Sequence, residues 1–342
     1  MLKRTILTVL AFLASAPLIG AETNFPGLTW DRPGLNAPEG WSPEKLRLAE
    51  ALFQANRSTA VMVVHNGHVV AAWGDVARTV DVWSVKSSLL GALYGIGVAE
   101  ARIDLNRSLV DLGIYDNEPS LTAAEREATV RDLLMMRSGI YHGAVFEPWV
   151  ATRPVRGSKE PGESWHYNAW DLNVLGTIYT RLTRETIFEA FDKRIARAIG
   201  MEDYRPERDG HFFHDSVSQH PAYIMFLSAR DLARFGLLYL NDGMWAGQQV
   251  IPSFWIREST KRWSDTSSGL GYGYMWWQLP SVLGLGGDGF AALGYQGQAV
   301  LVIPSKRLVV TQTADRTDSL IELTASHLFE LVRLIVAASP SK

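Results

Sequence analysis

The sequence predicts an α+β fold: one antiparallel sheet built from both chain ends, flanked by helices, with a mainly helical subdomain inserted between the two sheet parts. A hairpin pattern stands near the start, and short strand patterns return near the end. Helix-start signals fill the stretch between them. We therefore expect the sheet parts at about 42–83 and 264–342, and the helical part at about 84–263.

The first elements are a helix and a hairpin. Ser42 can cap a helix whose first turn holds Pro43. The apolar runs 61–65 and 68–73 flank Asn66-Gly67, the strongest short hairpin signal in a sequence. An apolar helix is expected next, from Ser84 to about residue 101.

Helix signals dominate the middle third. Capping-box patterns start at Thr129, Thr186 and Ser228. Gly200 supplies the left-handed residue that closes the helix beginning near Thr186. Strands are predicted over 271–278, 298–303 and 308–313, where aromatic or β-branched runs end at Gly or Pro. A last helix is expected over about 318–337.

Composition sets broad limits on function. The chain has 342 residues, of which 47% are hydrophobic and 20% charged, and its net charge is −3. No basic block predicts a nucleic-acid partner. The absence of cysteine excludes thiol catalysis and cysteine metal sites. Twelve tryptophans favour an aromatic-lined cleft, although such rings also fill protein cores.

The N-terminus has the pattern of a secretory signal. Lys3 and Arg4 precede an apolar run over 6–13, and cleavage is expected after Ala21 rather than after Ala16, since Pro17 would follow the latter cut. A retained membrane anchor is the alternative, but the run is short for a span. We expect residues 1–21 to be a signal peptide and 22–342 a single periplasmic or secreted domain without a stable membrane span.

Six segments, in order, resemble the β-lactamase and penicillin-binding-protein family of serine hydrolases, which includes class C β-lactamases, DD-peptidases and related esterases and amide hydrolases. The resemblance covers about 44–335, and its segments are 84–90 with 103–105, 130–139, 161–168, 175–176, 228–236 and 294–298. It implies the fold already predicted, with the reactive group in the cleft between the sheet and the helical part.

The resemblance implies roles for particular residues. Ser84 matches the nucleophile of the family's S-x-x-K motif, and backbone N–H groups near it could stabilise an oxyanion. Tyr167 matches the tyrosine of the Y-x-N motif, which moves protons between serine and leaving group. Ala169 replaces that motif's asparagine, and Asn168 stands one residue early. The family's Lys/His-x-Gly element falls at 291–294 without its Lys or His.

The lysine of S-x-x-K is missing. Ser87 stands at its position, and Lys86 is one residue early. Residues three apart share a helix face, so Lys86 is expected to point about 100° away from the face of Ser84 and Ser87. A local helix distortion that moves Lys86 into place is the alternative. Loss of a general base costs on the order of 10²- to 10⁴-fold in rate.

Other residues could serve the cleft. His142 and His166 are candidate replacement bases or substrate contacts, and Gly294, Gly297 and Gln298 are expected to line the cleft, with Asn168 as a further substrate contact. The pair His211 and His214 has no third ligand at metal-site spacing, so no metal is expected. No cofactor is implied either, because this chemistry needs only side chains and water.

Two functions remain open from the sequence. The first is an exported serine hydrolase that forms an acyl-enzyme on Ser84 and acts on small esters or amides, including β-lactam or peptide-like ones. The second is a pseudoenzyme that binds cell-wall-like or small-molecule ligands without turnover, which Ser87 and Ala169 favour. The sequence does not indicate the substrate or the oligomeric state.

Overall fold

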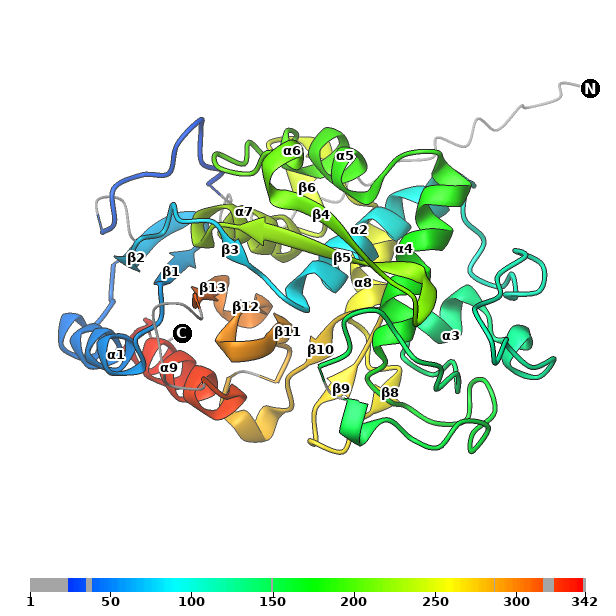
Figure 1. The fold of residues 1–342 in the computed structure, drawn as a ribbon. Coiled ribbons are helices and arrows are strands. Elements are labelled where there is room, and N and C mark those ends of the chain that lie inside the picture. The colour runs from blue at the N-terminus through cyan, green and yellow to red at the C-terminus, as the bar shows by residue number, and fades with distance from the viewer. Residues whose placement is uncertain (1–23, 35–38, 149, 286, 316–322, 341–342) are drawn as a thin grey trace, which may run out of the picture.

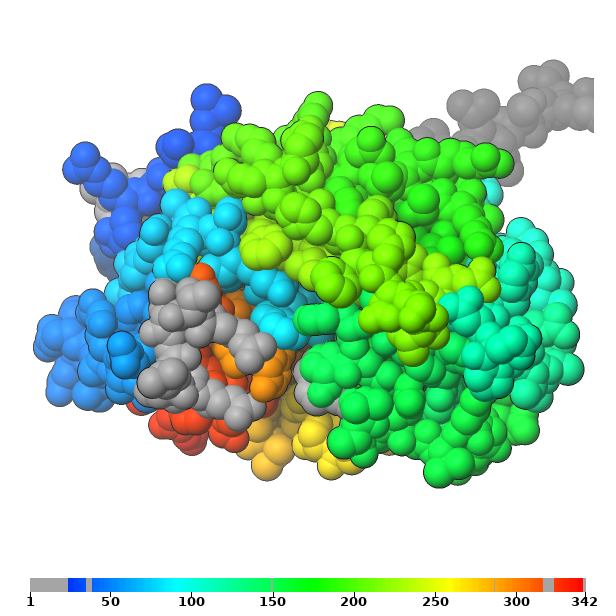
Figure 2. Space-filling view, in the orientation of Figure 1, coloured from blue at the N-terminus to red at the C-terminus, as the bar shows by residue number. Residues whose placement is uncertain are grey.

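The structure is a computed structural model, and it describes residues 24–34, 39–148, 150–285, 287–315 and 323–340. The predicted signal peptide lies outside the described residues. Within them, no helix is both long and apolar enough to cross a bilayer. Figure 1 shows a large sheet beside a mainly helical part, and Figure 2 shows the blue N-terminal and red C-terminal segments together on one side of the molecule.

The main sheet is antiparallel and joins both chain ends, as the sequence predicts. Its strand order is β2-β1-β13-β12-β11-β10-β9-β8, so the N-terminal hairpin pairs with the last strand. The strands are β1 (Ala60–His65), β2 (His68–Gly74), β8 (Ser264–Asp265), β9 (Gly271–Tyr272), β10 (Trp277–Gln278), β11 (Phe290–Leu293), β12 (Ala299–Ile303) and β13 (Leu308–Thr313).

Two layers of helices cover this sheet. Helices α1 (Pro43–Asn56) and α9 (Ala325–Ala338) pack together on one face, and α7 (Ala229–Leu240) packs on the other. Alternation along the strands divides the core: Val63 and Leu301 belong to the α1/α9 cluster, whereas Val300 and Val309 belong to the α7 cluster. Gly236 lets α7 approach closely, because a Cβ there would lie 2.5 Å from Val309 Cγ1.

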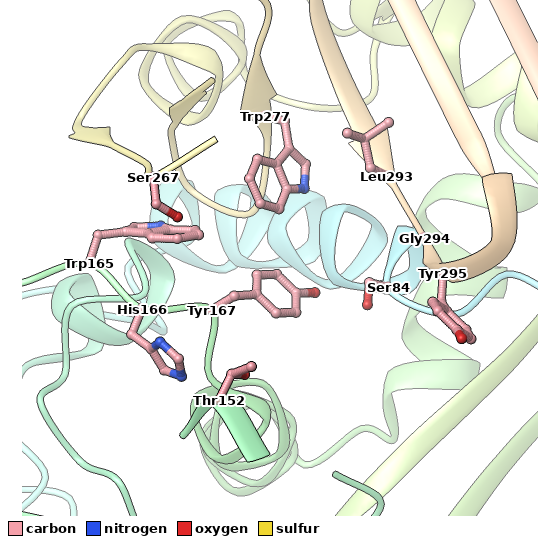
Figure 3. A pocket seen from close by; sticks show the side chains of 10 residues that line it. All are labelled: Ser84, Thr152, Trp165, His166, Tyr167, Ser267, Trp277, Leu293, Gly294 and Tyr295. Carbon is pink, nitrogen blue, oxygen red and sulfur yellow. The ribbon is translucent and has the colours of Figure 1, made fainter. Parts of the chain in front are cut away.

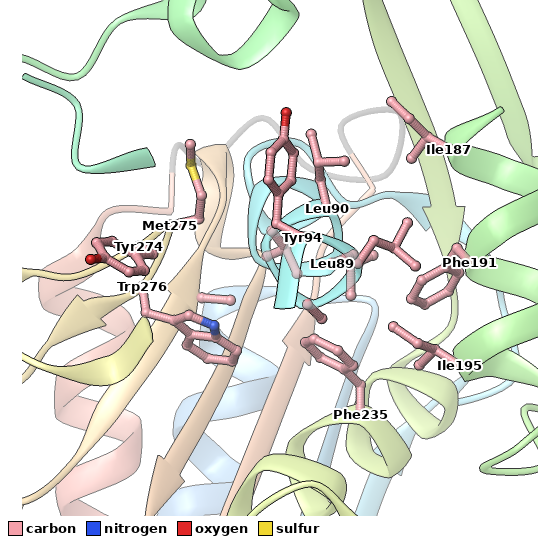
Figure 4. Packing of buried hydrophobic residues seen from close by; sticks show 14 of the residues in the cluster. Leu89, Leu90, Tyr94, Ile187, Phe191, Ile195, Phe235, Tyr274, Met275 and Trp276 are labelled. Atoms are coloured by element: carbon pink, nitrogen blue, oxygen red, sulfur yellow. The ribbon is translucent and has the colours of Figure 1, made fainter. Parts of the chain in front are cut away.

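The central helix α2 (Val85–Ala99) runs through the interior. Its residues from 85 to 97 are all buried. Figure 4 shows Leu89 and Tyr94 of this helix between Met275 on one side and Phe191 on the other. The remaining helices are α3 (Val130–Leu134), α4 (Ala169–Thr183), α5 (Ile187–Phe191), α6 (Pro206–Asp209) and α8 (Ser253–Thr260).

Several local predictions are confirmed. Ser42 accepts a hydrogen bond from Lys45 N at the start of α1. Asn66 and Gly67 both have positive φ, as the two-residue hairpin requires. Capping boxes form at Thr129 and Thr186. At Ser228 the cap forms without the box, because the Asp231 carboxylate accepts hydrogen bonds from the N–H groups of 202–204 instead.

Three predictions need correction. The segment 271–278 is not one strand: the tight turn between β9 and β10 holds Met275 at φ +64° and folds it into a hairpin. The middle third also contains β4 (Gly210–Asp215) paired with β5 (Ser218–Leu227), and β5 also pairs with β3 (Val80–Asp81). The last helix begins at Ala325, and 318–322 lie outside the described residues. A two-strand pair, β6 (Met244–Trp245) with β7 (Gln248–Gln249), completes the strands of the described residues.

Candidate active site

Ser84 lies at the junction of β3 and α2, immediately before the first helical residue. Its side chain makes no capping hydrogen bond, and its backbone already has helical angles (φ −72°, ψ −8°). The preceding Trp83 has φ +49°, and its N–H donates to Asp81 Oδ1 at 2.8 Å. A non-glycine residue in this region costs about 1–3 kcal/mol, so the surrounding contacts hold a strained turn that exposes Ser84.

A pocket of about 580 Å³ opens beside Ser84. Figure 3 shows its walls, which come from the start of α2, the segment before α4, the loop between β8 and β9, strand β10 and the end of β11. The lining side chains are mainly aromatic and uncharged: Ser84, Thr152, Trp165, His166, Tyr167, Ser267, Trp277, Leu293, Gly294 and Tyr295.

Tyr167 points its hydroxyl toward Ser84 (Figure 3). Its ring stacks on Trp277 with centroids 5.9 Å apart and meets the edge of Tyr272. Burial raises the pKa of the Tyr167 phenol, and the nearby hydroxyls of Ser84 and Ser87 offset part of that rise. Tyr167 is therefore a protonated phenol at neutral pH, suited to donating a proton and poorly suited to acting as a free base.

Ser87 lies buried behind Ser84, with 2% of its surface exposed. Among the described residues, neither Ser87 Oγ nor the Tyr223 hydroxyl has a partner with hydrogen-bond geometry. Burial raises the pKa of both the Tyr167 and the Tyr223 phenol, and the nearby Ser87 hydroxyl offsets part of each rise. The position of the family's lysine thus faces Tyr167 but carries no amine.

Lys86 points toward β5 and does not line the pocket. Its Nζ lies 5.2 Å from the centroid of the Tyr223 ring, and its side chain is buried. Burial lowers the pKa of Lys86 to about 8, against the opposing effect of the Asp81 carboxylate.

Gly294 at the end of β11 lets this strand approach the start of α2. A Cβ at Gly294 would lie 2.6 Å from Val82 O and 3.3 Å from Ser84 N. The Gly294 N–H is used by Gln298 O, whereas the Ser84 N–H donates no hydrogen bond to any described residue. A helix-terminal N–H without an internal acceptor can stabilise an oxyanion.

Four of the predicted contact residues serve the scaffold. Asn168 caps α4 and donates to Ile140 O at 2.7 Å, so its amide faces inward. His142 is buried between the carbonyls of Gly143 and Asn117. The Gln298 side-chain amide donates a hydrogen bond to Ala314 O and accepts one from Ala314 N. Gly297 O accepts a hydrogen bond from Gln312 Nε2. Hydrogen bonds within the protein therefore occupy these groups, and none of the four residues lines the pocket.

His166 does line the pocket. Its ring meets Tyr141 edge-on at 5.6 Å, and burial lowers its pKa. It is therefore neutral at pH 7, but Figure 3 shows it on the far side of Tyr167 from Ser84. Sequence reasoning did not identify Trp165, Trp277 and Tyr295 individually, although the abundance of tryptophan indicated an aromatic cleft. The described residues contain no cluster of three metal-ligating side chains.

Comparison with known proteins agrees with this architecture. The Beta-lactamase family model matches residues 47–323, and the chain belongs to this family. The fold is that of β-lactamase-like hydrolases and penicillin-binding-protein homologues, a family of serine hydrolases that includes esterases, amidases and β-lactamases.

Three solved structures illustrate the likeness. A Bacillus anthracis protein provisionally named as a 6-aminohexanoate-dimer hydrolase has 20% identity and a TM-score of 0.64 over 84% of this chain and 80% of that one. A penicillin-binding-protein homologue from Caulobacter crescentus has 15% identity and a TM-score of 0.64 over 87% and 99%. A family VIII carboxylesterase has 17% identity and a TM-score of 0.64 over 88% and 99%. At these identities the likeness concerns the fold.

Proposed function

We propose that the protein is an exported serine hydrolase that forms an acyl-enzyme on Ser84 and acts on small, reactive esters. The observation that carries this proposal is the placement of Ser84 at the start of α2, on the wall of an aromatic pocket, with the Tyr167 hydroxyl directed at it. Membership of a hydrolase family supports the general class of reaction.

The proposed first step forms the bond between Ser84 Oγ and the ester carbonyl carbon. Negative charge develops on the carbonyl oxygen, which the Ser84 N–H can stabilise. As the bond to the leaving alcohol breaks, the Tyr167 phenol gives its proton to that alcohol and takes the proton of Ser84. Atoms and protons balance, and the acyl group remains on Ser84.

Hydrolysis then reverses these roles. Water attacks the acyl carbon, one of its protons passes to Tyr167, and the Tyr167 proton returns to Ser84 Oγ as the acid is released. No amine or carboxylate from the described residues lines the pocket to accelerate either step. Reactive esters are therefore better substrates than amides, whose leaving group needs a proton before it can depart.

The second candidate is ligand binding without turnover. It is favoured by Ser87, whose buried hydroxyl occupies the position of the family's general base without a hydrogen-bond partner among the described residues. In this case the pocket would hold a cell-wall-like or other small ligand, and Ser84 would not react.

Incubation with a fluorophosphonate, and separately with a penicillin, followed by intact-mass analysis, distinguishes the two. Hydrolysis predicts a covalent adduct on the wild type that disappears in Ser84→Ala. Ser267→Ala is the matched control, because Ser267 lines the same pocket but lies outside α2, and it should keep the adduct. No adduct on the wild type would contradict the hydrolase proposal and favour the pseudoenzyme.

Export is the remaining part of the proposal. It rests on the charged start, apolar run and small-residue site of residues 1–21. Expression of the full chain in a Gram-negative host should deliver to the periplasm a protein whose first residue is Glu22. Full-length protein retained in the cytoplasm or the membrane would contradict this part alone.

A further inference from the structure

The pocket wall carries no charged side chain among the described residues. Its lining consists of serine, threonine, leucine, glycine and aromatic residues, with one histidine. Burial lowers the pKa of that histidine, His166, which keeps it neutral at pH 7. A substrate carboxylate entering this pocket would lose hydration without gaining an ion pair, so the lining disfavours anionic ligands.

A strip of aromatic side chains continues from the pocket to the surface. It starts at Tyr295, which lines the pocket, and passes to Trp83, whose ring centroid lies 5.3 Å away. Trp83 contacts Phe146 at 5.5 Å, and Phe146 contacts Phe213 on β4 at 6.3 Å. We call these four residues the aromatic strip.

Tyr295 is half-buried, and from Trp83 outward the exposure of the strip increases. Trp83 is 8% exposed, Phe146 40% and Phe213 52%. The strip is assembled from four distant parts of the chain: the β3–α2 junction, the segment before α4, the β4–β5 hairpin and the connection between β11 and β12. Contiguous exposed apolar side chains of this kind mark binding surfaces more often than isolated ones do. Their continuity with the pocket indicates that one ligand covers both.

We propose that the pocket and the aromatic strip together accept a neutral ester with an extended apolar chain, the chain lying along Tyr295, Trp83, Phe146 and Phe213. The position of the ester group at Ser84 rests on the proposed hydrolase function. The position of the apolar chain does not rest on that function, because it depends only on contacts with the aromatic strip. This gives a test of binding that is independent of turnover.

The binding test uses 4-nitrophenyl alkyl ethers, which resemble aryl esters but cannot be hydrolysed. Titration of methyl, butyl and hexyl ethers is followed by quenching of tryptophan fluorescence. Burial of each methylene contributes about 0.8 kcal/mol at most, which corresponds to up to about fourfold in affinity. We expect a gain of roughly two- to fourfold per methylene, and at least tenfold weaker binding for an ether whose chain ends in a carboxylate.

Substitutions in the aromatic strip test where the alkyl chain of the ether lies. Phe213→Ser and Phe146→Ser should remove most of the gain from butyl to hexyl while leaving methyl ether binding unchanged. Phe254→Ser is the matched control, because Phe254 is 41% exposed but lies on α8, outside the strip. Affinity that does not rise with chain length, or a gain that survives both strip substitutions, would overturn the inference.

Esters of the same chain lengths separate this inference from the proposed function. If ether binding depends on chain length but the wild type does not hydrolyse the esters, binding along the aromatic strip is supported and the hydrolase proposal is refuted. Ester turnover with a flat chain-length profile in both ethers and esters would support hydrolysis and refute the strip. Phenylalanine-dependent self-association without ether binding would identify the strip as an interface between copies and also overturn the inference.

Discussion

Ser87 stands where the proposed hydrolase lacks a general base. It lies one helical turn beyond Ser84, is 2% exposed, and faces the Tyr167 phenol. We expect Ser87→Lys to supply an amine on this face and to speed fluorophosphonate labelling of Ser84 by at least about tenfold, within the range for an added general base. The labelling rate is measured by stopping the reaction at several times and determining the labelled fraction by intact-mass analysis.

The control for this substitution is Ser87→Met, which adds a chain of similar length without the amine. Overpacking this buried position costs about 1–3 kcal/mol in either variant, so both should lose some stability. Faster labelling in Ser87→Met as well would assign the effect to repacking rather than to the base. Equal rates in wild type and Ser87→Lys would remove Ser87 as the cause of a slow site.

Lys86 makes the stability of the fold depend on pH. Burial lowers its pKa from 10.5 to about 8, so between these values the unfolded chain binds a proton that the folded protein does not. The free energy of unfolding contributed by this group therefore rises from about pH 8 to pH 10.5 and is lowest below pH 8. The full effect is on the order of 3 kcal/mol.

Lys86→Met should consequently be more stable than the wild type at pH 7, and the difference should shrink toward pH 10.5. Urea unfolding at several pH values measures it. Lys261→Met is the matched control, because the Lys261 ammonium also lies over a ring, that of Trp263, but its side chain is exposed. A difference for Lys86→Met that stays constant from pH 7 to 10.5 would contradict a lowered pKa.

At the scale of elements, the site depends on how closely β11 approaches the start of α2. Gly294 permits this contact, and its φ of −120° suits any residue. Gly294→Ala would push a methyl group against Val82 O and crowd Ser84 N, and so should shift the proposed oxyanion donor. Loss of one oxyanion donor costs about 10²- to 10³-fold, so we expect labelling of Ser84 to slow by at least about tenfold.

Gly27→Ala provides the comparison, since a Cβ at Gly27 meets no atom within 4 Å. Both variants should unfold near the wild-type midpoint in thermal scans if the damage at Gly294 is local. Unchanged labelling in Gly294→Ala would show that the junction tolerates the methyl group and that Ser84 N–H does not act as a donor.

Elements differed in how well the sequence predicts them. The β1–β2 hairpin was predictable because Asn66-Gly67 encodes its turn locally. The β9–β10 hairpin was not predictable, because its turn holds Met275 at positive φ and methionine is not a typical residue for such a turn. The inward-facing roles of Asn168 and Gln298 depend on contacts with distant backbone and could not be read from their motifs.

At the scale of the whole molecule, strands from both chain ends form the sheet on which the site is built, and helices from both ends cover one of its faces. Strand β13 lies between β1 and β12, and α9 packs on α1 across one sheet face. A hairpin pattern near the start and short strand patterns near the end predicted this arrangement. The local sequence did not specify that Phe213 of β4 would pack against Phe146, because that contact joins two distant parts of the chain.

Because α9 covers one face of this sheet, we predict that a destabilising substitution in α9 also destabilises the pocket. Ile335 of α9 is fully buried in the cluster beneath the sheet. Ile335→Ala should lower the free energy of unfolding by about 2–5 kcal/mol, the range for large-to-small core substitutions. Leu334→Ala, at a half-buried neighbouring position, should cost clearly less.

Urea unfolding followed by far-UV circular dichroism and by tryptophan fluorescence tests whether the molecule responds as one unit. The pocket tryptophans Trp165 and Trp277 contribute to the fluorescence signal, whereas α9 contains no tryptophan. Because both chain ends complete one sheet, we expect the two signals to shift to lower urea together in Ile335→Ala. A fluorescence transition that stays at the wild-type midpoint while the helical signal moves would mean that the pocket and the sheet face under α9 unfold separately.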